Sequence, residues 1–334
     1  MTKFQYYVQR LKRMKFKKYY SAAQEAHRAS GKNTILLMID MMMCSFQYSI
    51  GYTEYNEFEF YSIGKEKRQT FLNISNSILI SKTYNDQDLL YKVEDKGEFT
   101  KNFKDFIGRD VLYLDASSFE DFEAFMNKHR KVMAKVVNSE AGRGVEMIDM
   151  DQETRSLSEI YQACKDKNQS LVESYFIQHE DLSALSPTSV NTMRVITFLG
   201  DDGDVHFLAF VLKLGNGGTM DNFDQGGMYS VLSDDGVVLY PFMDKFRNRF
   251  TVHPLTKQEL IGFKIPLFEE VKEMLRKAAH VVPEVRYIGW DVAIGQNGPA
   301  IIEANPHTGV FQAPPSMTEN QEGLLPKYKK YIKF

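Results

Sequence analysis

The chain has 334 residues, of which 43% are hydrophobic and 25% charged, and its formal net charge is -3. This length allows two or three lobes with their own cores, and the near-neutral charge gives no case for nucleic-acid binding. The two cysteines, Cys44 and Cys164, form neither a disulfide framework nor a zinc-binding spacing. No run is long enough for a membrane span, and the start lacks a signal-peptide core. We expect a globular protein of the reducing cytoplasm.

The first twenty residues, MTKFQYYVQRLKRMKFKKYY, are locally basic. Six cationic side chains fall within nine residues and are interleaved with apolar ones; they are Arg10, Lys12, Arg13, Lys15, Lys17 and Lys18. We favour a solvated helix face packed on the body of the protein. The alternative is a surface helix that contacts anionic lipids at the inner face of a membrane.

An apolar and then aromatic segment follows. Thr34–Met43 (TILLMIDMMM) is either a strand or a buried helix, because periodicity does not separate the two. Met41–Met43 are expected to fill a core. Residues 45–80 are rich in Tyr and Phe and indicate aromatic packing without a readable function.

From Asp95 onward, strands and helices alternate. Ser118 is placed to cap one helix, and Ser156 with Glu159 forms a capping box for another. The expected helices are Phe99–Ile107, Phe119–Arg130, Leu157–Lys167 and Pro266–Val281. The expected strands are Asp110–Asp115, Val132–Val137, Val145–Ile148, Leu171–Ile177, Thr192–Leu199, Val205–Leu214, Tyr287–Ile294 and Pro299–Ala304. Strand pairs with intervening helices indicate α+β lobes, not a parallel doubly wound sheet.

The last two strands form a hairpin that carries three oxygen-bearing side chains. Asp291 interrupts the first strand, and Glu303 and Asn305 close the second. Because Glu303 and Asn305 are two apart, they point to the same side of the strand. The hairpin can bring Asp291 alongside them. Such donors suit Mg²⁺ with phosphate oxygens completing its shell, whereas the alternative is a hairpin whose polar residues face water.

A glycine-bearing loop follows the strand at residues 132–137. Gly142 and Gly144, with Arg143 between them, allow backbone amides to approach an anion closely. Lys135 on the preceding strand is placed to reach a phosphate. The alternative is a flexible hairpin turn with a solvated lysine.

Two further segments carry polar groups that need partners. In LVESYFIQHE, residues 171–180, the strand either lines an adenine pocket or is a plain edge strand. Arg194 and Lys213 interrupt apolar strands, so each requires a carboxylate or a phosphate. The loop at 220–230 contains Asn222 and a Gly226–Gly227 pair, and either offers free amides to the same site or is an ordinary turn.

The order of these segments resembles the ATP-grasp superfamily over about residues 95–306. In its D-alanine–D-alanine ligase branch, one lysine after an aspartate and one before the glycine loop contact ATP phosphates, and Lys96 and Lys135 match them. Two glutamates seven apart at the nucleotide hinge match Glu173 and Glu180. The closing Glu-x-Asn matches residues 303–305. The resemblance implies an α+β, ATP-grasp fold with two α+β lobes clamping ATP plus an amino-terminal lobe.

Several sequence segments are more similar still to those of the sugar-transfer-associated ATP-grasp proteins. The phrases SVNTMRVIT, DNFDQGG, IGWDVAI, IEAN and GYTEY are similar to that family's recurring segments. This resemblance spans most of the chain and implies a substrate or accessory lobe at 1–94. It also implies a small lobe with a phosphate lid at 95–178. A large lobe with the metal and catalytic site would follow at 179–334. The family is associated with cell-surface polysaccharides, which implies small-molecule or glycan-linked carboxylate and amine substrates.

The resemblance implies a ligase that forms a C–N bond through an acylphosphate, with release of ADP and phosphate. The alternatives are a kinase of a sugar hydroxyl and a non-catalytic nucleotide-binding scaffold. Metal ligands for one or two Mg²⁺, or Mn²⁺ instead, are implied at Asp291, Glu303 and Asn305. ATP contacts are implied at Lys96, Lys135, Gly142, Arg143, Gly144, Glu173, Phe176 and Glu180, and catalytic roles at Arg194, Lys213 and Asn222.

Two positions depart from the D-alanine ligase branch. The arginine that steadies the transferred phosphoryl group there is replaced by Gly289, so Arg194, Arg247 or Arg249 takes its place. An insertion at 181–187 follows the hinge and leaves the ribose ligand open between Glu180 and two alternatives, His179 and Asn191.

Overall fold

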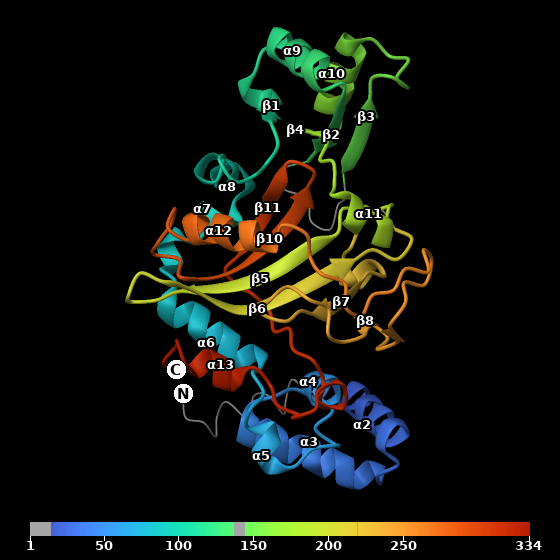
Figure 1. Ribbon diagram of the computed structural model, residues 1–334, viewed down its shortest axis with the longest axis vertical. Helices are drawn as coiled ribbons and strands as arrows, with labels where there is room; N and C mark the ends of the chain where they lie inside the picture. Colours follow the sequence, from blue (N-terminus) through green and yellow to red (C-terminus); the bar gives the residue numbers. More distant parts are fainter. Residues whose placement is uncertain (1–14, 137–143, 219) are drawn as a thin grey trace. The chain divides into compact units, whose positions relative to one another are not determined.

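The computed structural model describes residues 15–136, 144–218 and 220–334. The chain forms two compact units (Figure 1). Unit 1 comprises Met1–Asn85 together with His307–Phe334, and unit 2 comprises Asp86–Pro306. Unit 2 is therefore inserted between two parts of unit 1. The expected division at 94/95 and 178/179 stays a prediction, and the tail from His307 groups with the amino-terminal unit.

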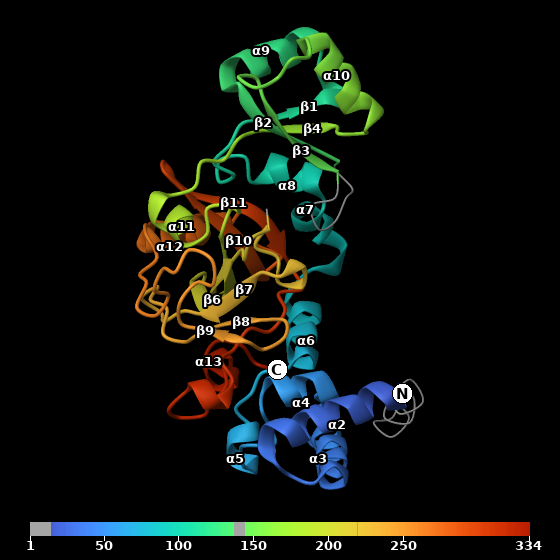
Figure 2. The same ribbon diagram turned by 90° about the vertical axis from the view of Figure 1, so that its right-hand side faces the viewer.

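Unit 1 is helical in its described residues. Its helices are α2 (Phe16–Ser30), α3 (Thr34–Tyr48), α4 (Tyr52–Glu57), α5 (Lys65–Arg68), α6 (Ile74–Tyr84), η4 (Pro315–Met317) and α13 (Leu325–Lys329). The ambiguous run at 34–43 lies in α3, because the Asn33 side chain accepts the backbone N–H groups of Ile35 and Leu36 and starts a helix. Figure 2 shows α2 and α3 side by side.

Aromatic residues and the carboxy-terminal tail complete the core of unit 1. Tyr55, Phe60 and Phe71 are among its buried residues, as the sequence predicted for this segment. The tail is held by backbone contacts. The Gln312 Nε2 donates to the Leu72 carbonyl at 2.7 Å, and the Gln312 Oε1 accepts from the Leu324 N–H at 3.0 Å. Val310 of the tail also packs against this core, so residues from both parts of unit 1 contribute to it.

The first sheet of unit 2 has four antiparallel strands in the order β1-β4-β2-β3. They are β1 (Val111–Tyr113), β2 (Lys131–Lys135), β3 (Val145–Asp149) and β4 (Leu171–Ser174). Helices α9 (Phe119–His129) and α10 (Leu157–Asp166) share one apolar cluster with the sheet. Ser118 caps α9, and Ser156 with Glu159 forms the predicted capping box of α10. The alternating burial of β2 fits a sheet covered on one face.

The second sheet has seven antiparallel strands in the order β11-β10-β5-β6-β7-β8-β9. They are β5 (Thr192–Leu199), β6 (Val205–Leu214), β7 (Met228–Val231), β8 (Phe242–Asp244), β9 (Arg249–Phe250), β10 (Tyr287–Gly295) and β11 (Gly298–Asn305). The other elements of unit 2 are η1 (Gln87–Leu89), α7 (Tyr91–Glu94), α8 (Lys96–Asn102), η2 (Leu114–Ala116), α11 (Glu180–Leu185), η3 (Phe223–Gln225) and α12 (Phe268–Ala278). The α+β prediction is confirmed. The helix expected to end at Val281 ends at Ala278.

In the described part of the chain, no helix combines the length and the apolar character needed to cross a bilayer.

Candidate active site

The hairpin of β10 and β11 aligns the predicted carboxylates. Asp291 lies directly opposite Glu303 in the strand register, and the neighbouring strand β5 places Arg194 opposite Asp291. Directly opposed residues of paired strands project from the same face of a sheet. Arg194, Asp291 and Glu303 therefore form a row across three adjacent strands. Asn305 joins it, because its Nδ2 donates to the Glu303 Oε1 at 3.3 Å.

Asp291 is held by the two cations that interrupt the apolar strands β5 and β6. The Arg194 Nε donates to the Asp291 Oδ1 at 2.5 Å, and the Arg194 Nη2 donates to the Oδ2 at 2.9 Å. The Lys213 Nζ donates to the Oδ1 at 3.0 Å. Asp291 is only 5% exposed, and its burial opposes ionisation. Arg194 and then Lys213 overcome that burial and hold the pKa of Asp291 well below its usual range.

Asp221 is a third carboxylate of this cluster, and the sequence did not single it out. Its Oδ2 accepts the backbone N–H of Thr192 at 2.8 Å and the Thr192 hydroxyl at 2.6 Å. Burial raises the pKa of Asp221, and Lys213 opposes that rise. The only sequence signal was its position beside Asn222. A lone aspartate in a Gly-rich loop has many structural roles, so that signal was too weak to select it.

Glu303 differs electrostatically from Asp291. Its side chain keeps solvent access, yet surrounding protein atoms and then the neighbouring Asp291 charge raise the pKa of Glu303. Arg194 and Lys213 therefore face three carboxylates, those of Asp221, Asp291 and Glu303. The cluster retains an excess of negative charge at its Glu303 end.

The residues at this end fit a divalent cation. Two carboxylates and an amide are the hard oxygen donors that Mg²⁺ takes, and a cation would relieve the negative excess. Glu303 is the more available carboxylate, because Asp291 is already paired. Among the described residues, no group of three or more His, Cys, Asp or Glu side chains is placed to hold a metal. Asp291 and Glu303 alone would not fill the coordination shell of a metal ion. The Asn305 amide oxygen and oxygens of a bound phosphate would have to complete it.

A second charged cluster lies on the four-stranded sheet around Glu173. The Arg109 Nε lies 2.9 Å from the Glu173 Oε2, and the Arg109 Nη2 donates to the Oε1 at 3.2 Å. The Lys135 Nζ also donates to the Oε2. Burial opposes ionisation of Glu173, but Arg109 and then Lys135 lower its pKa. The structure thus brings together Lys135 and Glu173, which the sequence assigned to different parts of ATP.

Arg109 also connects the two sheets of unit 2. Its Nη1 donates to the carbonyls of Ile107 at 2.9 Å and of Ile301, on β11, at 3.2 Å. No local pattern pointed to this residue, because Arg109 lies 64 residues from Glu173 and 192 from Ile301. Only the folded chain brings the three together.

The segment after β4 runs along the end of β10. The His179 N–H donates to the Ile294 carbonyl at 2.8 Å. Phe176 packs over Gly295, where an added Cβ would meet the Phe176 Cζ at 3.0 Å. Glu180 begins α11 with an exposed side chain. The expected strand at 171–177 ends at Ser174, so Phe176 lies in the connection after it.

The two alternative ribose ligands have structural partners. Asn191 is buried, and its Nδ2 donates to the carbonyls of Leu182 at 3.0 Å and Ser186 at 2.9 Å. Its Oδ1 accepts the N–H of Gly215. The His179 Nδ1 accepts the N–H of Asp181 at the start of α11. Asn191 is therefore committed to holding the chain after α11.

The remaining predicted residues are placed as follows. Lys96 is the first residue of α8, has an exposed side chain and follows the capping residue Asp95. The Asn222 carbonyl accepts the N–H of Gly227 at 3.0 Å and closes the loop before β7. Gly144 has a φ of 72° and begins the return from the glycine loop. Gly142 and Arg143 lie outside the described residues.

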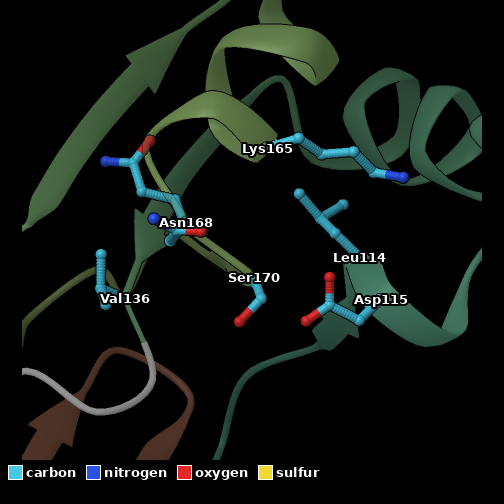
Figure 3. A pocket seen from close by; sticks show the side chains of 7 residues that line it. Leu114, Asp115, Val136, Lys165, Asn168 and Ser170 are labelled. Carbon is cyan, nitrogen blue, oxygen red and sulfur yellow. The ribbon is translucent and has the colours of Figure 1, made fainter.

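A separate pocket of about 360 Å³ opens in the region of the four-stranded sheet (Figure 3). Asp115, Lys165, Asn168 and Ser170 are among its lining residues, and none of the predicted site residues lines it. Figure 3 shows the Asp115, Lys165, Asn168 and Ser170 side chains around the pocket. The predicted site residues lie instead in or near the two charged clusters around Asp291 and Glu173.

A family model described as sugar-transfer associated ATP-grasp matches residues 75–333 of the chain. No curated protein matches the sequence significantly.

Three of the solved structures that the chain is similar to are the following. ATP-grasp ligase PsnB, complexed with minimal precursor, Mg and ADP, is 13% identical with a TM-score of 0.42, over 82% of this chain and 70% of that one. N5-carboxyaminoimidazole synthetase from Staphylococcus aureus, complexed with ADP, is 11% identical with a TM-score of 0.41, over 70% and 51%. D-alanyl-alanine synthetase A from Vibrio cholerae is 12% identical with a TM-score of 0.37, over 72% and 60%. The chain spans 64% of another PsnB structure, solved with precursor peptide PsnA2 and AMPPNP.

Proposed function

The chain belongs to the sugar-transfer-associated ATP-grasp family, as its sequence predicted, and from that premise we propose that it is an ATP-dependent carboxylate–amine ligase. The observation that carries the proposal is the row of charged side chains on β6, β5, β10 and β11. Two partly buried cations, Lys213 and Arg194, share the buried Asp291 beside Glu303, so opposite charges are held in fixed positions with little access to solvent. Such preorganisation suits the transfer of a phosphoryl group.

The reaction has two steps. A carboxylate oxygen attacks the γ-phosphorus of ATP, the bond between that phosphorus and the β,γ-bridging oxygen breaks, and ADP leaves. The amine nitrogen of the second substrate then attacks the carbonyl carbon of the acylphosphate. The C–O bond to phosphate breaks, the nitrogen loses a proton, and the amide and inorganic phosphate leave. Phosphorylation thus supplies the leaving group that a free carboxylate lacks.

The roles of the chain's own residues follow from their charges. Arg194 and Lys213 stabilise the negative charge of the transferred phosphoryl group, with Asn222 in the loop beside them. Lys96 and Lys135 bind the ATP phosphates. The loop that ends at Gly144, whose residues 142 and 143 lie outside the described part of the chain, is our proposed lid against water, which would hydrolyse an acylphosphate.

Other residues of the chain are assigned to binding the nucleoside and the metal ion. Glu173, Phe176 and Glu180 contact the nucleoside, and Arg109 holds Glu173 in place. Asp291, Glu303 and Asn305 would hold Mg²⁺. When bound, one or two such ions supply charge neutralisation at the terminal phosphates.

The substrates are proposed from the family's description. A glycan or a glycan-linked molecule supplies the carboxylate or the amine, in the making of cell-surface polysaccharide. We place the protein in the cytoplasm, with its basic amino-terminal residues in contact with an anionic membrane where lipid-linked glycans are built.

A phosphate-release screen tests the proposal. The full chain is incubated with ATP and Mg²⁺ over pairs of amino acids, acidic sugars and amino sugars, and each hit is analysed by mass spectrometry. We expect stoichiometric ADP, phosphate and an amide. A stable phosphorylated sugar without an amide would instead identify a kinase, and tight ATP binding without turnover would identify a scaffold.

Two variants test the site within the same screen. We expect Glu303→Gln and Lys213→Met each to lower turnover by about 100-fold or more, because the first removes a charged ligand proposed for Mg²⁺ and the second removes a cation at the transferred group. Glu284→Gln removes an exposed carboxylate elsewhere in unit 2 and serves as the control. Full turnover in both site variants would overturn the assignment.

A further inference from the structure

Helix α3 of unit 1 exposes a continuous apolar stripe. Six large hydrophobic side chains on this helix are between 43% and 68% exposed. They are Ile35, Leu36, Ile39, Met42, Met43 and Phe46. Their spacing of one, three, three, one and three residues places them on one side of a helix. The prediction that Met41–Met43 fill a core is wrong for Met42 and Met43.

The opposite side of α3 is already packed. Leu37, Met41 and Cys44 are buried in the core of unit 1. Asp40 is the only charged residue of the helix. Its carboxylate accepts hydrogen bonds from the Arg68 guanidinium at 2.7 Å and from the Tyr55 hydroxyl at 2.6 Å. The exposed stripe therefore carries no charge. A helix that is apolar on both sides is typical of a buried element, so the stripe needs a cover.

Cationic residues lie on the helix that packs against α3. The Tyr19 hydroxyl of α2 donates to the Met38 carbonyl of α3. Lys15, Lys17 and Lys18 at the start of α2 are exposed, and Phe16 among them is 65% exposed. The preceding sequence adds Arg10, Lys12 and Arg13, which lie outside the described residues.

We propose that the exposed stripe of α3 inserts into the surface of an anionic lipid bilayer, with the lysines of α2 contacting the headgroups. Apolar side chains beside cations match acyl chains beneath acidic headgroups. A helix of 15 residues is about 22 Å long, too short for a hydrocarbon core of about 30 Å, so α3 lies in the plane of the membrane.

The same charges disfavour a second copy of the chain as the cover. A two-fold contact through α3 would repeat every group on both partners and add one set of lysines to the other. The proposal adds an apolar contact to the electrostatic contact proposed above, and it does not depend on the ligase reaction.

Vesicle co-sedimentation of the full chain tests the proposal. Phosphatidylcholine vesicles with and without phosphatidylglycerol are compared at low salt and at about 0.5 M salt, which screens charge pairs. The test variant is Leu36→Gln, Ile39→Gln and Met43→Gln combined. The matched control is Leu239→Gln, Leu255→Gln and Ile261→Gln combined, which changes three exposed apolar residues of unit 2.

The wild type is expected to bind anionic vesicles and to keep a salt-resistant fraction. We expect the α3 variant to lower its partition at high salt by about tenfold or more, because apolar burial is insensitive to screening. Lys15→Gln, Lys17→Gln and Lys18→Gln combined should lower binding mainly at low salt. The unit 2 control should match the wild type. Circular dichroism confirms that each variant keeps its helices.

Depth is measured with Phe46→Trp and brominated lipids, against Phe246→Trp in unit 2. We expect quenching above the native Trp290 background only in Phe46→Trp. Wild-type binding by the α3 variant at high salt would overturn the proposal. A dimer that dissociates in the α3 variant, without vesicle binding by the wild type, would also overturn it and would identify a protein contact. Neither outcome affects the test of the ligase by phosphate release.

Discussion

At the residue scale, Asp291 has the most constrained environment of the candidate site. It is nearly fully buried and shares its carboxylate between Arg194 and Lys213. Asp291→Ala leaves both cations without this partner in a dry setting, so we expect the free energy of unfolding to fall by about 3–5 kcal/mol. Urea denaturation measures it.

The exposed ion pair between Asp110 and Lys128 provides a matched control. Their side chains are 2.5 Å apart but largely solvated. Asp110→Ala should therefore cost about 1 kcal/mol or less. An equal loss in the two variants would mean that Asp291 does not balance buried charge.

Glu303 is expected to behave in the opposite way. Its pKa is raised, so its ionised form is disfavoured in the folded chain, and its contribution to stability falls as pH rises from the unfolded pKa through the folded one. Glu303→Gln removes that penalty at neutral pH. We expect the Tm without metal to rise by roughly 1–3 °C while ligase turnover is lost. A calorimetric scan that shows a lower Tm would contradict this.

Glu173 sets a pH dependence of the other sign. Its lowered pKa means that its stabilising contribution is present above the unfolded value of 4.5 and is lost as pH falls through the lower folded value. Arg109→Met removes the larger cause of that lowering, so the acid loss of stability should begin at higher pH. Urea midpoints of the two proteins over a pH series measure the shift. If the urea midpoints of the two proteins coincided at every pH, the ion pair between Arg109 and Glu173 would not contribute to stability.

At the element scale, local patterns predicted most of unit 2. The capping serines fixed the starts of α9 and α10, and the glycine turn fixed the hairpin that sets Asp291 opposite Glu303. Such signals act over a few residues and survive in any tertiary context. The identity of α3 and the exposure of Met42 and Met43 were not readable, because periodicity does not say which apolar face is covered. Arg109 was missed for the related reason that its partners are distant in sequence.

Gly108 offers a test of the connection between α8 and β1. It has a φ of 59°, and a Cβ there would lie 2.6 Å from the Ala300 Cβ of β11. Gly262 has a φ of 81° with nothing within 4 Å of an added Cβ. Both alanine variants should lose about 1 kcal/mol for the positive φ. Gly108→Ala should lose about 1–3 kcal/mol more for the collision. Equal urea midpoints for the two would contradict the close approach.

At the scale of the whole molecule, the insertion of unit 2 into unit 1 predicts separable stabilities. Removal of residues 307–334 takes away Gln312, which bonds to Leu72, and Val310, which packs against the core of unit 1. We expect hydrogen exchange to accelerate in peptides from 16–71 and to stay unchanged in peptides from β5, β10 and β11. Loss of protection throughout unit 2 would contradict independent cores.

The interrupted sequence of unit 1 also has a consequence for synthesis on the ribosome. Its aromatic residues are translated before unit 2, whereas the tail, whose Val310 packs against them, is translated after all of unit 2. At about 5–20 residues per second, the nascent chain carries these aromatic residues without the tail for roughly 10–40 s. The inserted unit is translated within this interval, so it has time to fold before residues 307–334 emerge and join unit 1.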